Sequence, residues 1–172
     1  MREHAGGLLH SHGVASTDDI AAVAAMIGRP PQAEFDVVVR GDDSQPIVIR
    51  NAPFLHDGTP MPTRYWLVDP ALTFAISRLE SAGAVKQLDA ELDPAAIQAA
   101  HDCYSAERDA AISVDHVGAR PSGGVAGTAR GLKCLHAHYA HWLVTHDDVV
   151  GERVHQMLQA SGGAPITETE IG

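Results

Sequence analysis

The sequence is poor in cysteine, aromatic residues and basic residues, and it lacks a long hydrophobic run. Its 172 residues include 2 cysteines, 5% aromatic residues, and 12 Lys and Arg against 22 Asp and Glu. Two cysteines are too few for a disulfide framework and are typical of a reducing cytoplasm. The formal net charge of -10 disfavours nucleic acids and anionic membranes, because both attract an excess of Lys and Arg. We therefore expect neither a nucleic-acid nor a membrane partner.

The lack of long apolar stretches bears on location and domain organisation. A membrane-spanning helix needs about 18 apolar residues in a row, and the chain has no such run. Residues 1–15 lack the basic start and apolar middle of a secretory signal, so we expect a cytoplasmic protein. The length fits one ordinary domain. We predict a flexible arm at 1–16, a single α+β domain at 17–160 and a frayed tail at 161–172.

Apolar residues at helical spacing, with the residues that start and stop helices, predict five helices. These cover about 17–27, 70–82, 94–111, 132–144 and 151–160. Thr17 is the expected cap of the first helix. The pairs Asp69-Pro70 and Asp93-Pro94 each place a capping carboxylate before a proline at the first helical position.

Two β-branched stretches, 35–40 and 46–50, flank a turn-rich segment and predict a β-hairpin. A third short strand is expected at 65–68. The order of helix, hairpin, strand and then mostly helices favours an α+β fold, with a small antiparallel sheet packed against about five helices. The glycine-rich stretch 112–128 is predicted to be a mobile linker or lid.

The chain has eleven histidines, and three of them lie within eight residues of one another and of Cys134. If this segment is one helix, Cys134, His138 and His141 share a narrow stripe, whereas His136 points to the opposite side. Thiolate and imidazole are preferred zinc ligands, so the spacing indicates a site for zinc or another transition metal. His136 would be an alternative ligand or a partner of the ligands.

Two other interpretations of the same residues stay open. A buried cysteine often packs as a small hydrophobic residue, and histidines often bond to carbonyl groups. Alternatively, Cys134 is a nucleophile and a neighbouring histidine its general base, since such a pair can share one helix face.

The segment Gly131–His141, which reads GLKCLHAHYAH, closely resembles a signature of the bacterial family called domain of unknown function 501. Further matching motifs stand at 28–31, 55–70, 77–80 and 101–108, and the resemblance covers about 18–151. It implies a small cytoplasmic bacterial protein of a family whose biochemical role is not established. Family members often carry Cys or His at the position of Asp69. The resemblance therefore makes Asp69 a candidate fourth ligand, and the alternative is an ordinary helix cap.

A second group, His101, Tyr104 and Arg108, can face one direction along its predicted helix. It would either brace the helix against the long loop that follows or clamp a phosphate or carboxylate, for which Arg is suited. Gly123–Gly127 does not follow a strand and is not followed by Gly-Lys-Ser/Thr, so we expect no nucleotide site there.

The sequence thus predicts a metal-binding protein of unknown reaction. Four protein ligands would make the metal structural, whereas three would leave a position for an activated water and hydrolysis. The rival hypothesis is a metal-free binding or scaffold module that acts through protein–protein contacts. The expected partner is an unidentified protein or small molecule, and no oligomeric state is assigned.

Overall fold

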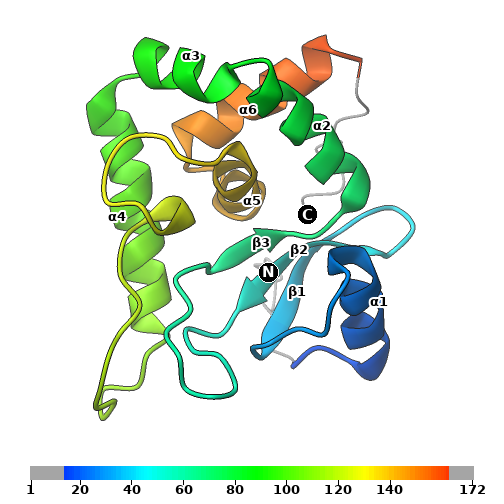
Figure 1. Ribbon diagram of the computed structural model, residues 1–172, viewed down its shortest axis with the longest axis vertical. Helices are drawn as coiled ribbons and strands as arrows, with labels where there is room; N and C mark the ends of the chain where they lie inside the picture. Colours follow the sequence, from blue (N-terminus) through cyan, green and yellow to red (C-terminus); the bar gives the residue numbers. More distant parts are fainter. Residues whose placement is uncertain (1–13, 163–172) are drawn as a thin grey trace, which may run out of the picture.

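The computed structural model describes residues 14–162 and confirms the α+β class (Figure 1). Within that range, one antiparallel sheet of order β1-β2-β3 is combined with six α-helices. The elements are α1 (Thr17–Ile27), β1 (Phe35–Arg40), β2 (Pro46–Asn51), β3 (Tyr65–Leu67), α2 (Pro70–Ser81), α3 (Ala84–Glu91), α4 (Pro94–Ala110), the 3₁₀ turn η1 (Val125–Gly127), α5 (Leu135–Thr145) and α6 (Val149–Ala160). The predicted arm and tail lie outside the described residues, except for 14–16 and 161–162.

The first residues of the helices show which of the predicted helix caps are correct. Asp69 and Asp93 cap α2 and α4, with Asp69 accepting a hydrogen bond from the Leu72 backbone N–H at 2.7 Å. The cap of α1 is Ser16 and not Thr17, because Ser16 forms a reciprocal capping box with Asp19. The short helix α3 was not predicted. It begins directly after the turn that ends α2.

The start of α5 differs from the prediction in a way that matters for the site. The helix begins at Leu135, and Cys134 precedes it with an extended backbone of φ -148° and ψ 119°. The Cys134 side chain makes no capping hydrogen bond; instead, Glu80 of α2 accepts the Leu135 backbone N–H at 2.7 Å. The prediction of one helical stripe is therefore wrong for Cys134, which lies before the helix that carries His138 and His141.

The sheet is enclosed by helices on both faces, with α1 on one side and α5 on the other (Figure 1). Neighbouring residues of the central strand β2 point to opposite faces. Val48 belongs to the larger core shared with α5, whereas Ile49 packs with Val23 of α1 and Phe35. This double burial explains why β2 reads as a continuous apolar run.

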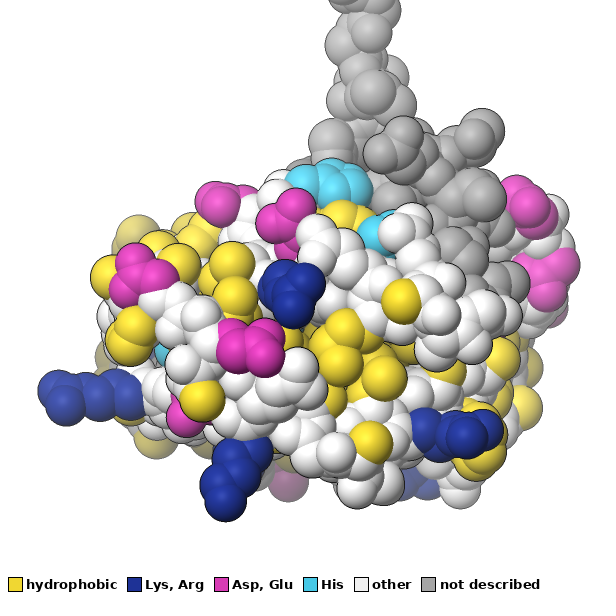
Figure 2. Space-filling model, turned by 90° about the horizontal axis from the view of Figure 1, so that it is seen from above, with side chains coloured by type: hydrophobic (Ala, Val, Ile, Leu, Met, Phe, Trp, Pro, Cys, Tyr) yellow, Lys and Arg dark blue, Asp and Glu magenta, His cyan; other side chains and the backbone are white. Residues whose placement is uncertain are grey.

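The surface at the top of Figure 1 carries side chains of both charges. Figure 2 shows acidic and basic side chains interspersed there, with hydrophobic side chains between them. Of the helices in the described part of the chain, none has the length and apolar character needed to cross a membrane.

Candidate metal centre

Side chains from α2 and from the start of α5 meet in a small cluster of metal-ligand type. Glu80, Cys134 and His136 each offer one ligand atom, and these atoms lie within 4.8 Å of one another. The Cys134 Sγ is 3.7 Å from His136 Nδ1, which is 3.3 Å from Glu80 Oε1. All three residues are partly exposed. Their arrangement could hold a metal ion.

Hydrogen bonds on the far side of the His136 ring determine which nitrogen faces the cluster. Nε2 lies 2.9 Å from the Thr73 carbonyl oxygen and 3.2 Å from Ser77 Oγ, both on α2. A carbonyl oxygen can only accept, so Nε2 carries the proton. Nδ1 is then the atom that faces Sγ and Oε1. Metal-binding histidines commonly donate their other N–H to a backbone carbonyl in this way.

The cluster also changes the proton affinity of His136. The hydrogen bond with Cys134 raises the pKa of His136 to about 9. Partial burial opposes this shift, while the Thr73 carbonyl and the Glu80 carboxylate add to it. The ring is thus protonated at neutral pH without a metal, and a metal ion at Nδ1 would have to displace that proton.

The spacing of the three atoms can be compared with tetrahedral zinc. Bonds of about 2.3 Å to sulfur and about 2.0 Å to nitrogen and oxygen place S and N about 3.5 Å apart and N and O about 3.3 Å apart. The corresponding distances here are 3.7 Å and 3.3 Å. The two distances from Nδ1 are therefore close to those around a tetrahedral ion, and all three ligand atoms lie within 4.8 Å of one another.

The other predicted ligands are placed elsewhere. Asp69 caps α2, as described above. His138 and His141 are fully buried, and both donate from Nδ1 to the carboxylate of Asp148, at 2.8 Å and 2.9 Å. Among residues 14–162, the only group of three ligand side chains within reach of one ion is Glu80, Cys134 and His136. Of the predicted ligands, Cys134 and His136 thus lie together beside Glu80, and the others lie apart from this cluster.

Asp148 is the centre of a second, buried cluster that joins α5 to α6. Besides the two histidines, its carboxylate accepts the backbone N–H groups of Val150 and Gly151 at 3.0 Å and so caps α6. Burial alone would raise the pKa of Asp148, but the hydrogen bonds from His138 and His141 hold it at about 2. These bonds leave both Nε2 atoms buried and without a hydrogen-bond partner in the described part of the chain.

The predicted group on α4 holds the long loop in place. His101 accepts the Val125 backbone N–H at Nδ1 and donates from Nε2 to the Gly131 carbonyl. Arg108, only 1% exposed, donates to the Gly123 carbonyl at 2.7 Å. The Tyr104 hydroxyl accepts the Arg64 backbone N–H at 2.6 Å, and burial raises its pKa to about 12. The His101 and Arg108 side chains thus donate within the protein.

Two important residues were missed by the sequence analysis. Glu80 lies in the segment 77–80, which was noted as a family match, but it looks like an ordinary acid on an amphipathic helix. Asp148 follows a helix that ends at Thr145 and precedes α6, so its position favours a cap. Nothing in the local sequence indicates that the same carboxylate receives two histidines.

The fold and cluster together define a small α+β protein with a candidate Glu/Cys/His metal centre. A family model described as protein of unknown function, DUF501, matches residues 37–156. The match covers more than half of the chain, so the protein belongs to this family, as the motifs around Cys134 predicted. No curated protein and no solved structure matches the chain.

Proposed function

We propose that this protein binds a transition metal ion, with zinc favoured, and that the ion supports a hydrolytic reaction. The ligands are the Glu80 carboxylate, the Cys134 thiolate and the His136 Nδ1. The observation that carries the proposal is the position of Nδ1, which faces the other two ligand atoms at tetrahedral spacing while Nε2 is bonded to Thr73.

The three protein ligands found among residues 14–162 favour a reactive ion over a purely structural one. Structural zinc sites are closed by four protein groups, whereas catalytic sites keep one position for water or substrate. Cys134 and His136 also line an open cleft beside strand β3. A bound ion would lower the pKa of a coordinated water and supply hydroxide near neutral pH.

The same geometry disfavours a simple thiol enzyme. In a nucleophile–histidine–acid arrangement, the acid holds one ring nitrogen while the other accepts the proton of the nucleophile. Here Cys134 and Glu80 both approach Nδ1, and a backbone carbonyl occupies Nε2. Convergence on a single nitrogen fits shared coordination of an ion better than it fits this arrangement.

The first test is the metal content of protein purified without an affinity tag. We expect about one equivalent of zinc in the wild type and in Cys103→Ala, which changes the other free cysteine. We expect loss of the metal in Cys134→Ala and His136→Ala. Cobalt substitution should produce thiolate-to-cobalt charge-transfer absorption in wild type and Cys103→Ala only.

The fourth coordination position of the ion, which the proposal leaves for water, can be tested separately. Adding azide to the cobalt protein should change its visible spectrum if a non-protein position exists, and should leave it unchanged if four protein groups close the shell. The proposal would be disproved if the protein bound no metal when titrated with zinc and cobalt. It would also be disproved if Cys134→Ala contained as much metal as the wild type. Those results, with a melting temperature unaffected by chelator, are what the metal-free binding module predicts.

A further inference from the structure

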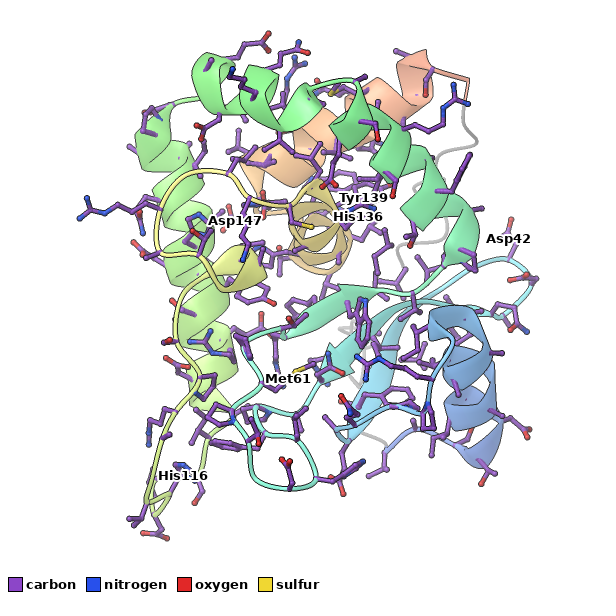
Figure 3. All side chains as sticks on the ribbon, viewed as in Figure 1. Asp42, Met61, His116, His136, Tyr139 and Asp147 are labelled. Carbon is purple, nitrogen blue, oxygen red and sulfur yellow. The ribbon has the colours of Figure 1, made fainter. Side chains whose placement is uncertain are left out.

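A cleft of about 530 Å³ lies next to the candidate metal centre. One side is formed by residues 61–63 and strand β3, and the other by residues 133–137 at the start of α5. Met61 and His136, labelled in Figure 3, come from these two sides. Its volume is in the usual range of small-molecule sites.

Most of the cleft wall is apolar or aromatic, including Met61, Trp66 and Leu67. Besides His136, the described residues that line it include two cations, Arg29 and Lys133, and no Asp or Glu. This is unusual for a chain with a formal net charge of -10. A cleft lined by one sign of charge concentrates ligands of the opposite sign.

Arg29 is held in position over the cleft wall. Its guanidinium carbon lies 5.4 Å from the centre of the Trp66 ring, and its Nη1 donates to Gln32 at 2.7 Å. Stacking on an aromatic ring limits the conformations of the side chain while its other donors stay available. The guanidinium is therefore placed to pair with an anionic group above an aromatic surface.

We infer that this cleft binds a small organic anion, a phosphate or carboxylate attached to a flat apolar body. The anionic group pairs with Arg29 and Lys133, and the apolar body packs on Trp66 and Met61. The inference rests on the proposed function in one respect: a ligand in this cleft lies against Cys134 and His136, so it is the class of substrate that a metal ion there would meet.

The probes that test this share one ring system. Metal-free protein is titrated with 2-naphthyl phosphate, 2-naphthoate, 2-naphthol and inorganic phosphate by calorimetry. We expect both naphthyl anions to bind at least about tenfold more tightly than 2-naphthol or inorganic phosphate. The reason is that 2-naphthol lacks the anionic group and inorganic phosphate lacks the apolar ring. Comparison of the two anions shows whether phosphate or carboxylate is preferred.

Substitutions then locate the binding. Arg29→Gln and Lys133→Gln should each weaken the binding of 2-naphthyl phosphate by about tenfold, whereas Lys86→Gln, at an exposed position of α3, should not change it. The chain has two tryptophans, so the indole N–H signals in an NMR spectrum give an internal control. Trp66 should shift on titration, and Trp142, which packs with Tyr139 and His155, should not.

Equal binding of 2-naphthol and 2-naphthyl phosphate would overturn the inference, as would wild-type affinity in both cleft variants. Because the titrations use metal-free protein, this failure is separable from failure of the metal proposal. Anion binding without any metal uptake would refute the metal centre alone. Metal uptake without anion binding would refute the cleft assignment alone.

Discussion

The Glu80 carboxylate accepts the Leu135 backbone N–H at 2.7 Å, so the acid beside Cys134 and His136 also caps helix α5. One side chain thus has a structural contact and a candidate ligand role. Two substitutions can separate them, because an amide oxygen accepts a hydrogen bond but is a poor metal ligand.

We expect Glu80→Gln to keep the cap and lose the metal. In metal-free protein its free energy of unfolding should stay within about 1 kcal/mol of wild type, while zinc affinity falls by more than about 100-fold. Glu80→Ala should lose the metal and a further 1–2 kcal/mol or so of stability. Urea unfolding and competition with a chelator measure the two effects. Wild-type zinc affinity in Glu80→Gln would exclude this residue as a ligand.

Asp148→Asn should destabilise the protein strongly. The substitution removes a carboxylate that accepts hydrogen bonds from two buried histidines, and a buried donor left without its partner typically costs about 1–3 kcal/mol. Asp147→Asn is the matched control, since the neighbouring Asp147 is exposed. Urea unfolding at pH 7 gives both values. A loss below about 1 kcal/mol in Asp148→Asn would show that these buried hydrogen bonds contribute little to stability.

The same carboxylate predicts an acid dependence of stability. The pKa of Asp148 falls from 3.8 to about 2 on folding, so the folded protein binds fewer protons between those values. Its contribution, about 2 kcal/mol, is complete above about pH 4 and is lost as pH falls through 2. The stability difference between wild type and Asp148→Asn should therefore shrink by about that amount from pH 5 to pH 2. A constant difference would contradict the lowered pKa.

Gly151→Ala tests the close approach of α5 and α6. Alanine favours a helix by about 1 kcal/mol over glycine, so helix propensity alone predicts stabilisation. A Cβ at this position, however, would lie 2.3 Å from Trp142 Cβ and 2.5 Å from the His138 carbonyl oxygen. We expect the clash to prevail and to destabilise the protein by about 1–3 kcal/mol. A higher melting temperature in the variant would contradict this packing.

Arg108→Gln should loosen the loop that follows α4. The guanidinium donates to the Gly123 carbonyl, and a shorter neutral side chain cannot replace this contact. Hydrogen exchange should accelerate at 121–131 and remain slow in β2. Arg120→Gln, an exposed position in the same loop, is the control. Unchanged exchange in Arg108→Gln would show that the loop is held by other contacts.

Local signals in the sequence were sufficient for much of the fold. The Asp-Pro pairs located α2 and α4 because cap and proline act within one helical turn, and β-branched runs located the hairpin because strand preference is also local. The first residue of α5 was misplaced by three positions. Its cap comes from Glu80, which lies 55 residues away in the sequence, and no local pattern reports that contact.

The candidate site was predictable in part for the same reason. Cys134 and His136 stood out by residue type, but assigning both to one helix turned them to opposite sides. In the structure, Cys134 precedes the helix and can approach the His136 ring. Whether His136 or His138 lies beside Cys134 depends on this one backbone boundary.

The two clusters on α5 differ greatly in the lengths of chain that they close. Asp148 is 10 and 7 residues from His138 and His141, whereas Glu80 and Thr73 are 56 and 63 residues from His136. Short loops cost less entropy to close, so we expect the α5–α6 pair to assemble early and α2 to dock onto it later. A metal ion held by Glu80 and His136 would then stabilise α2 after it has docked. It would slow the departure of α2 during unfolding and leave early assembly unchanged.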